Sequence, residues 1–397
     1  MTSFQYLRYG NRHLRPLGPI AVISHQVDSA LSDAINFHLR NRRSLYLEEN
    51  PELDEWVGYY RSDYRVPVDL TRFNSGEGRA QILETVRGHD LFIITDVLNY
   101  GQYTTRFNRT VSISPDEHYQ DLVRLIAATH GVTRRINVMM PYLYEGRRYR
   151  RHNRGSLDGA LILKQLFEMG VTNVFTFDAH DGRIANAVPR NNFETLPTSL
   201  QIIEALVDSF DDLQIDRDHF MIVAPDEMAI SRCIYYASLM HVPLGICYRQ
   251  YDQVNSLQFG NEIIEKRFLG DDVEGKDVLI VDDMIDTGKT ILDVAKILKE
   301  KGARRIFAAV TFALFTKGFE KINQAYESGH ITKIFATNAA YRPPVLLDSE
   351  WYCDVNLSKY AALMIDAVNH DASLSSLLDP TERIDELLKE HRERGND

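Results

Sequence analysis

The sequence has few of the features that place a protein in a specialised class. Its three cysteines, Cys233, Cys247 and Cys353, are scattered and lack the spacing of metal ligands, which argues against a disulfide framework or a structural zinc site. No apolar run approaches the length of a membrane span, and Met1–Leu17 lacks the apolar core of a signal peptide. We therefore expect a cytoplasmic protein with no membrane partner, whose cysteines are small buried residues.

Positive charge is also in deficit. The chain has 45 lysines and arginines against 56 aspartates and glutamates, a formal net charge of −11. Nucleic acids and anionic membranes attract basic surfaces, so we expect neither to be the main partner. Low-complexity tracts are missing too, and 44% of the 397 residues are apolar. The chain is long enough for two globular domains, each with its own core.

A Walker A phosphate-binding loop is missing as well, although Gly288-Lys289-Thr290 looks like its end. That loop needs a glycine five positions before the Gly-Lys pair, where this chain has Asp283. Val278–Val281, which lies just before, is a run of mostly β-branched residues typical of a buried parallel strand. Apolar residues then recur at helical spacing until Gly302. The segment is therefore predicted to be a strand, an acidic turn and the start of a helix.

The turn combines carboxylates with hydrogen-bond donors. Backbone N–H groups and hydroxyls at a helix N-terminus bind anions. A phosphorylated sugar suits the combination, because the donors can hold the phosphate while the carboxylates hold ribose hydroxyls or a divalent metal ion. An acidic turn with an ordinary helix N-cap is the alternative. The turn residues are Asp282, Asp283, Asp286, Thr287, Gly288, Lys289 and Thr290.

Apolar β-rich runs alternate with helical patterns along the chain. This alternation predicts an α/β protein whose mostly parallel sheets are flanked by helices. We expect two such domains, residues 1–196 and 197–397, with the last helix packing back on the first domain. The predicted strands are Ile20–Ser24, Leu91–Thr95, Ile136–Met140, Val174–Phe177, Met221–Ala224, Val278–Val281 and Ile306–Thr311. The predicted helices include Asp28–His38, Asp116–Thr129, Leu157–Met169 and Leu200–Phe210.

Ligands of open α/β sheets bind beyond the carboxyl ends of the strands, so the residues that follow the predicted strands are candidates. The segment Arg147–Arg154 has five arginines in eight residues. Clustered guanidinium groups indicate a polyphosphate ligand. A solvated basic loop and a nucleic-acid patch are the alternatives.

Two further strand ends have acidic candidates. His180 stands between Asp178 and Asp181, and an imidazole beside carboxylates can bind a metal-bound nucleotide or transfer a proton. Asp226 and Glu227 follow another strand and can contact a metal ion or a ribose. A structural histidine and a simple turn are the respective alternatives.

The segment Val278–Thr290 closely resembles the phosphoribosyl pyrophosphate motif of the type I phosphoribosyltransferase fold. In its Val-Asp-Asp-Met-Ile-Asp-Thr-Gly form it is most similar to ribose-phosphate pyrophosphokinases. The resemblance extends from about Arg72 to the end of the chain, with the motifs in the family's order. It implies two type I phosphoribosyltransferase-like domains. The implied reaction transfers the pyrophosphoryl group of Mg·ATP to ribose 5-phosphate and gives phosphoribosyl pyrophosphate and AMP, with Mg²⁺ as cofactor.

The resemblance also assigns site residues. Arg72–Glu77 matches a loop that reaches into a neighbouring subunit's nucleotide site, which implies a homo-oligomer with a shared site. Its phenylalanine would stack on adenine. Pro141–Arg150 matches the family's ATP-binding segment, and Asp178-Ala-His180 matches a motif whose histidine contacts the metal-nucleotide. The implied ATP contacts are Phe73, Glu77, Arg147, Arg148 and His180, and the implied metal ligands are His180 and Asp226.

The chain departs from the family pattern at several positions. Ser75 replaces a usual aspartate, Arg148 replaces a usual glutamine, and Met228-Ala229 replaces a pair of glycines. The lead-in Met1–Thr71 is longer than usual, and Tyr100–Pro115 is an apparent insertion. We expect these additions to cover an oligomer surface.

The catalytic cations depart as well. The family has a lysine and an arginine on a flexible loop before the acidic turn, where Arg249 is the nearest cation here to the lysine position. Lys266 and Arg267 are the reserve candidates for the catalytic group. An active pyrophosphokinase is the main hypothesis. An enzyme for another ribosyl acceptor and a non-catalytic regulatory paralogue are the alternatives.

Overall fold

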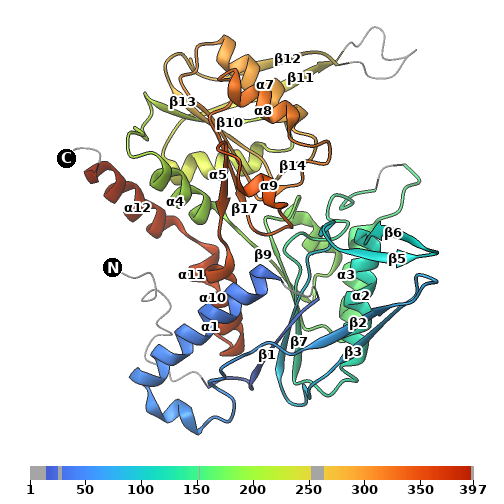
Figure 1. The fold of residues 1–397 in the computed structure, drawn as a ribbon. Helices are drawn as coiled ribbons and strands as arrows, with labels where there is room; N and C mark the ends of the chain where they lie inside the picture. Colours follow the sequence, from blue (N-terminus) through green and yellow to red (C-terminus); the bar gives the residue numbers. More distant parts are fainter. Residues whose placement is uncertain (1–14, 26–28, 152, 252–262, 395–397) are drawn as a thin grey trace. The chain divides into compact units, whose positions relative to one another are not determined.

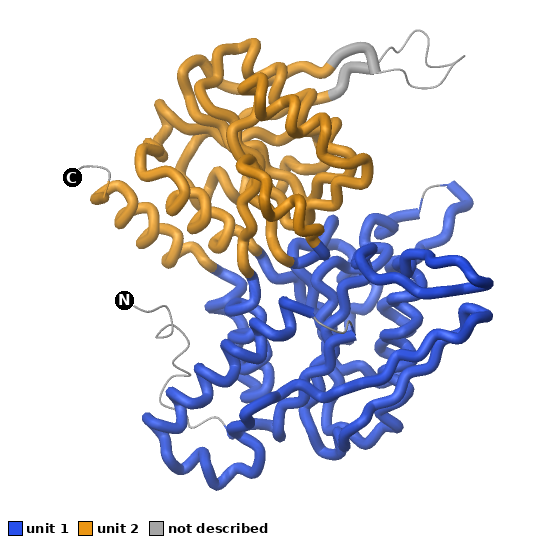
Figure 2. The backbone as a smooth tube through the Cα atoms, in the orientation of Figure 1, with its two compact units in different colours: residues 1–197, 339–341, 357–379 blue, residues 198–338, 342–356, 380–397 orange. Residues whose placement is uncertain are grey.

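A computed structural model describes residues 15–25, 29–151, 153–251 and 263–394. It divides into two compact units (Figure 2). Unit 1 comprises residues 1–197, 339–341 and 357–379, and unit 2 comprises residues 198–338, 342–356 and 380–397. None of the helices in these described ranges is long and apolar enough to cross a membrane.

Unit 1 is built on a five-stranded parallel sheet of order β1-β4-β7-β8-β9. Helices α1 and α10 lie on one side of it, and α2 and α3 lie on the other (Figure 1). The strands are β1 Ile20–Ser24, β4 Asp90–Ile94, β7 Arg135–Met139, β8 Asn173–Phe177 and β9 Asn192–Leu196. The helices are α1 Ala30–Glu49, α2 Pro115–Ala128, α3 Asp158–Glu168, α10 Ser358–Asn369 and α11 Ser375–Leu378, with short 3₁₀ helices at Pro51–Glu55 and Gly182–Ala187.

Two antiparallel hairpins extend unit 1. The first consists of β2 (Val68–Arg72) and β3 (Gly78–Ile82), and the second consists of β5 (Tyr103–Arg106) and β6 (Arg109–Ser112). The second hairpin lies within the insertion expected at Tyr100–Pro115. It has a two-residue turn in which both residues have positive φ, a geometry that matches the twist of paired strands.

Unit 2 is built on a seven-stranded sheet of order β12-β11-β10-β13-β15-β17-β18, parallel except for β11 with β12. Alternate residues of its strands enter two hydrophobic cores, one under α4, α5 and α12 and one under α7 and α8. The strands are β10 Phe220–Ala224, β11 Leu244–Tyr251, β12 Ile263–Leu269, β13 Asp277–Val281, β15 Ile306–Val310, β17 Lys333–Thr337 and β18 Tyr352–Val355, with the short pair β14 Met284–Ile285 and β16 Phe312–Ala313. The helices are α4 Ser199–Ser209, α5 Ile230–Met240, α7 Lys289–Glu300, α8 Glu320–Glu327, α9 Pro344–Leu347 and α12 Thr381–Arg394.

The expected α/β fold class is confirmed, and each of the predicted strands is present with its ends shifted by no more than one residue. Helix α1 is longer than predicted and ends at Glu49 instead of His38. The last helix, α12, belongs to unit 2. Its apolar residues Ile384 and Leu388 are one helical turn apart and enter the core beneath α4 and α5 of unit 2. Helix α10 is the late segment that returns to unit 1 and packs on α1.

A polar ladder crosses the sheet of unit 1 at the amino ends of its strands. The Asn137 side-chain amide donates to the Asp90 carboxylate (2.8 Å), and the Asn173 amide donates to Asn137 (2.5 Å). Asn192 continues the ladder by donating to Asn173 (2.7 Å). Because buried polar groups are costly unless they are hydrogen-bonded, the side chains of neighbouring strands satisfy one another. The ladder lies at the edge opposite the one where α/β sheets bind ligands.

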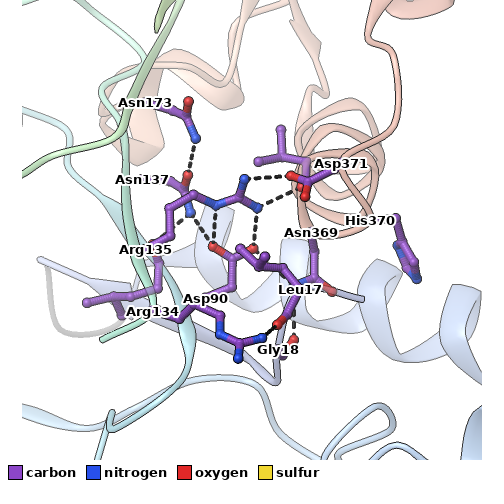
Figure 3. Close-up of polar contacts among 12 residues, drawn as sticks. Leu17, Gly18, Asp90, Arg134, Arg135, Asn137, Asn173, Asn369, His370 and Asp371 are labelled. Atoms are coloured by element: carbon purple, nitrogen blue, oxygen red, sulfur yellow. Dashed lines mark hydrogen bonds and ion pairs between the residues drawn. The ribbon is translucent and has the colours of Figure 1, made fainter. Parts of the chain in front are cut away.

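Asp90 also joins this ladder to helix α10 (Figure 3). Its carboxylate accepts two hydrogen bonds from the Arg135 guanidinium (2.9 and 2.8 Å) and one from the Asn369 amide (3.0 Å). Arg135 reaches further, to Asp371 (2.8 Å) and to the backbone oxygen of Val368 (2.7 Å). The C-terminal end of α10 is thereby held to the sheet by charge-assisted bonds.

A second ionic group, at Asp366, joins α10 to α1. Arg42 Nε donates to one carboxylate oxygen (2.6 Å) and Arg43 Nε to the other (3.0 Å), and all three side chains are buried. Arg43 also donates to Asn369 (2.5 Å) and to the backbone oxygen of Tyr59 (2.9 Å). Burial alone would raise the pKa of Asp366, but its interactions with His370 and with the two guanidinium groups outweigh burial and lower it. Asp366 is therefore ionised in the folded protein.

We predict that Asp366→Asn destabilises unit 1 by about 3–5 kcal/mol, because two buried guanidinium groups lose their counter-charge. The native pKa of Asp366 lies below its unfolded value. Its contribution is therefore present at neutral pH and is lost as the pH falls below about 4, where the unfolded chain takes up the proton. Urea unfolding between pH 3 and 7 measures both effects.

Asp371→Asn is the matched control, because this partner of Arg135 has a side chain that is 64% exposed. We expect it to cost less than about 1 kcal/mol. Equal losses of unfolding free energy in the two variants at neutral pH would contradict the assignment of Asp366 as the counter-charge of Arg42 and Arg43.

Candidate functional site

The segment after β13 folds as the sequence predicted: a strand, a turn and a helix. Asp282 N–H still pairs with the neighbouring strand end at Ala309 (3.0 Å). The chain then turns through β14, and Gly288 adopts φ 78° as the N-cap of α7. A β-carbon there would be strained by this φ and would lie 3.1 Å from Ile322 Cδ1, so glycine is required at this position.

The N-terminus of α7 has unfilled hydrogen-bond donors. The backbone N–H groups of Thr287, Gly288 and Thr290 donate to no atom among the described residues. Lys289 N–H makes only a long contact of 3.5 Å with the Thr287 hydroxyl. Thr287 and Lys289 are exposed. Four successive amides at an open helix N-terminus form a site for an anion.

The carboxylates of the turn differ in their surroundings. Asp286 accepts a hydrogen bond from the Thr316 hydroxyl (2.6 Å). Asp282 accepts one from the backbone N–H of Asp283 (2.8 Å) and is partly buried. Asp283 is only 4% exposed, and its carboxylate lies 3.9 Å from an Arg232 nitrogen. Asp283 therefore belongs to the interior of the turn.

The electrostatics of Asp282 show that this part of unit 2 holds excess negative charge. Burial raises its pKa well above the ordinary value for an aspartate, and the neighbouring Asp283 and Asp226 raise it further. Asp226 follows β10, and its carboxylate accepts hydrogen bonds from the backbone N–H groups of Met228 (2.9 Å) and Ala229 (3.4 Å) before α5 begins. The structure therefore brings three of the predicted acidic residues into one electrostatic group.

The antiparallel pair β11–β12 contains the candidate catalytic cations. Strand register places Arg249 opposite Lys266. The side chain of Arg249 lies outside the described residues. Lys266 Nζ donates to the backbone oxygen of Thr290 (3.3 Å) and lies 3.6 Å from Asp293, so it is held against the first turns of α7. Arg267, the next residue along β12, is exposed.

In unit 1, the end of β8 and the arginine segment meet around Tyr149. The ring centroids of Tyr149 and His180 are 6.1 Å apart. The guanidinium carbons of Arg150 and Arg183 lie 5.8 and 5.5 Å from the Tyr149 ring centroid. Arg183 also pairs with Asp181 (2.5 Å), and its hydrogen bonds and charge lower the pKa of that carboxyl group. The structure thus joins His180 to the arginine segment, as expected of residues that follow neighbouring strands.

Sequence reasoning missed Tyr149 and Arg183. An aromatic residue among arginines is a signal for stacking between guanidinium groups and a ring, and Tyr149 stands directly between two arginines. Arg147 and Arg148 lie on the exposed part of the same segment. The loop before them is a tight turn, in which Arg148 N–H donates to Glu145 O (2.8 Å).

The predicted nucleotide loop forms the tip of the hairpin β2–β3. Phe73 N–H donates to Glu77 O (2.9 Å), and the Ser75 hydroxyl donates to the Glu77 carboxylate (2.9 Å). Phe73 is 47% exposed. No described contact joins this tip to Tyr149 or His180, so the structure does not bring these predicted nucleotide contacts together within unit 1.

The described part of the chain contains no set of three or more histidine, cysteine, aspartate or glutamate side chains placed to hold a metal ion. The two predicted metal ligands belong to different units, His180 to unit 1 and Asp226 to unit 2. All three cysteines are free, and two of them, Cys233 and Cys247, are buried as expected.

Comparison with known proteins gives consistent results for both halves of the chain. Residues 44–170 match the model for the N-terminal domain of ribose phosphate pyrophosphokinase, and residues 189–342 match the model for the phosphoribosyl transferase domain. A ribose-phosphate pyrophosphokinase of Shewanella oneidensis is 30% identical over 312 residues, which cover 77% of this chain and 89% of the relative. That of Chromobacterium violaceum is 30% identical over 271 residues, which cover 67% and 74%.

A solved structure shows the same fold. The crystal structure of phosphoribosylpyrophosphate synthetase from Mycobacterium smegmatis aligns with a TM-score of 0.68 at 18% identity, covering 89% of this chain and all of that one. The expected pair of phosphoribosyltransferase-type domains is therefore confirmed. From the extent of the sequence matches, the chain belongs to the ribose-phosphate pyrophosphokinase family.

Proposed function

We propose that this protein is a ribose-phosphate diphosphokinase, which transfers the pyrophosphoryl group of ATP to the 1-hydroxyl of ribose 5-phosphate and gives phosphoribosyl pyrophosphate and AMP. The observation that best supports the proposal is the turn after β13, where an acidic pair directly precedes an open helix N-terminus. Incubation with Mg·ATP and ribose 5-phosphate tests it, because pyrophosphoryl transfer releases AMP while ordinary phosphoryl transfer releases ADP. Release of neither product would contradict the proposal.

In this proposal, the turn of unit 2 binds the sugar phosphate. The amides and hydroxyls of Thr287–Thr290 hold the 5-phosphate, because they are open donors at a helix N-terminus. Asp282 and Asp283 orient the ribose hydroxyls. Asp282, which is only partly buried, is better placed for this role than Asp283, which is 4% exposed. Positioning of this kind is the main contribution of a protein to phosphoryl-type transfer.

The nucleotide contacts come from unit 1. Phe73 stacks on adenine, Glu77 contacts the nucleotide, and Arg147 and Arg148 bind the triphosphate. His180 lies against Tyr149, beside two further guanidinium groups, which suits contact with phosphate oxygens. Arg72–Glu77 resembles the family loop that reaches into a neighbouring subunit's nucleotide site. We propose a homo-oligomer on the basis of this resemblance.

The acidic residues of unit 2 offer oxygen ligands of the kind that Mg²⁺ prefers. Burial and the neighbouring Asp283 and Asp226 raise the pKa of Asp282, and a hard divalent cation would favour its ionised form. Asp226 would hold Mg²⁺ directly. His180 is the other predicted ligand, although an imidazole suits Mg²⁺ less well than oxygen does. When bound, Mg²⁺ neutralises charge on the triphosphate.

One observation favours a second candidate, an enzyme for another ribosyl acceptor. Met228 replaces a family glycine and is 52% exposed beside the carboxylate of Asp226. A larger side chain there reshapes the pocket next to the sugar. Release of AMP with a different ribosyl compound, and none with ribose 5-phosphate, would favour this candidate. ATP binding without AMP release from either would favour a regulatory paralogue.

We predict that Asp282→Asn stabilises the magnesium-free protein by about 1–2 kcal/mol at pH 8 while lowering kcat/KM by at least tenfold. Because the native pKa of Asp282 is raised, ionisation of this group favours the unfolded chain. The cost is absent below the ordinary aspartate value, near pH 4, and grows as the pH rises towards the native value. The stabilisation by asparagine therefore increases from pH 5 to pH 8.

Thermal unfolding with a chelator present measures the first effect, and AMP release measures the second. Asp271→Asn, at an exposed position outside the turn, is the control and leaves both unchanged. A loss of stability in Asp282→Asn, or an unchanged kcat/KM, would refute the assignment of Asp282 to the sugar site.

Arg147→Ala is predicted to raise the KM for Mg·ATP about tenfold with little change in the KM for ribose 5-phosphate, because one charge-assisted contact to phosphate is lost. Arg190→Ala, which removes an exposed arginine elsewhere in unit 1, serves as the control. If Arg147→Ala instead weakened binding to RNA or DNA and left ATP untouched, the arginine segment would be a nucleic-acid site.

Arg249→Ala is predicted to lower kcat by a factor on the order of 10²–10³ with a small effect on the KM for ATP, because a cation facing the transferred group acts mainly in the transition state. Arg267→Ala tests the second reserve cation, and Lys296→Ala, which removes an exposed lysine on α7, is the control. Should Lys266→Ala abolish AMP release while Arg249→Ala retains it, the catalytic cation would be Lys266, which the described contacts already hold at α7.

A further inference from the structure

The hairpin β5–β6 lies beside the predicted nucleotide loop at the tip of β2–β3 (Figure 1). The backbone N–H of Phe107, in the turn of the second hairpin, donates to the carbonyl oxygen of Asn74 in the turn of the first (3.2 Å). Asn74 directly follows Phe73. A β-carbon on Gly76 would lie 3.0 Å from Arg106 Cδ, so the two tips are in van der Waals contact as well.

Both hairpins are anchored to the start of helix α2. Arg106 pairs with Glu117 (3.1 Å), and Glu117 completes the capping box of α2 with Ser114. From the other hairpin, Arg72 pairs with Asp121 and donates to the backbone oxygen of Glu117 (3.3 Å). These shared anchors fix the position of one tip relative to the other.

Phe107 is an unusual residue for the end of such a hairpin. Its φ is 47°, in the left-handed region that costs a non-glycine residue free energy, and glycine or asparagine is the ordinary choice in this kind of turn. Its side chain is 79% exposed. Neither Phe107 nor Phe73 makes a ring contact with any residue in the described ranges. A strained backbone residue whose aromatic ring is exposed to solvent suggests that the ring binds a ligand.

We propose that Phe107 is a second nucleobase contact, which acts with Phe73 so that the two hairpin tips hold a purine nucleotide from two sides. The inference rests on the proposed function, because the role of Phe73 as an adenine contact comes from it. Aromatic side chains stack on any base, since every base has a π face. Arg109, two residues beyond Phe107, is exposed and makes no ion pair within the described part of the chain, so the same tip also offers a cation to a phosphate group.

The charges around the tips also suit a nucleotide. Arg106 is neutralised by Glu117, and Arg79 by Asp69 (3.1 Å), which leaves Arg109 and Glu77 as the exposed charges nearest the two rings. The guanidinium group can face a phosphate, and the carboxylate can accept a hydrogen bond from a base or ribose. An apolar subunit contact would not need these two charges at the centre of the patch.

The test compares Phe107→Ala and Phe107→Gly with the parent in AMP release and in direct ATP binding by equilibrium dialysis. We expect each variant to raise the KM and the Kd for ATP about five- to fiftyfold, with kcat and the KM for ribose 5-phosphate unchanged. Glycine suits the positive φ of this position, so it removes the ring without straining the hairpin. Phe107→Trp should restore the parent values. Tyr103→Ala, which removes a ring that is 65% exposed on the same hairpin, is the control and should change nothing.

Each other outcome decides the question. An unchanged KM and Kd in both Phe107 variants, with Phe73→Ala impaired, would overturn the proposal and leave the proposed function intact. A change in sedimentation that accompanies the change in KM would assign Phe107 to a subunit contact and would also overturn it. A parent that releases no AMP would refute the proposed function alone, because the Kd for ATP still reports on Phe107. The losses of ATP-binding free energy in Phe73→Ala and Phe107→Ala can also be compared with the loss in the double variant. A double-variant loss that differs from their sum would support stacking of both rings on one base.

Discussion

The main electrostatic constraint on unit 2 is the group of carboxylates at the end of β13, where burial and neighbouring negative charge raise the pKa of Asp282. Asp282 is partly buried, lies next to a nearly buried Asp283 and feels Asp226 from the neighbouring strand end. Such a group opposes folding when its members are ionised. It persists because β13 is a central strand, paired in parallel with β10 on one side and β15 on the other, and the turn is held further by β14 and β16. The sheet thus maintains a charge arrangement that a substrate and a cation can neutralise.

In unit 1, by contrast, buried carboxylates are compensated by donor groups. Asp90 and Asp366 are fully buried, but each carboxylate is met by guanidinium or amide donors from another segment. A fully satisfied network of this kind fixes which segments pack together, and it lies at the amino ends of the strands or between helices, away from the ligand edge. Guanidinium groups thus compensate the buried carboxylates of unit 1, whereas in unit 2 the neighbouring carboxylates raise the pKa of Asp282, and this contrast is a physical criterion for separating structural from functional carboxylates in this chain.

Local sequence pattern predicted the elements whose formation depends on their own residues. The buried strands and the turn at Gly288 were found because continuous β-branched runs and a glycine before a helix have few alternative structures. The packing partners of α10 and α12 were not predicted, because the residues of an amphipathic helix do not identify the distant surface that the helix covers. The same holds for Tyr149, whose importance comes from Arg183 and His180, residues more than 30 positions away that the fold brings to its ring.

The two hairpin tips also bear on how a base would be recognised. Ser75 replaces a family aspartate, and its hydroxyl is taken up by Glu77 (2.9 Å), so the loop offers fewer hydrogen-bonding groups to a base than the family pattern does. Stacking between Phe73 and Phe107 would replace some of that binding free energy, but stacking distinguishes poorly between bases. Discrimination between adenine and other bases would then depend on Glu77, the nearest group able to accept a hydrogen bond from an exocyclic amine. A loop that gains an aromatic partner while losing a carboxylate would therefore bind a base more tightly and with less selectivity.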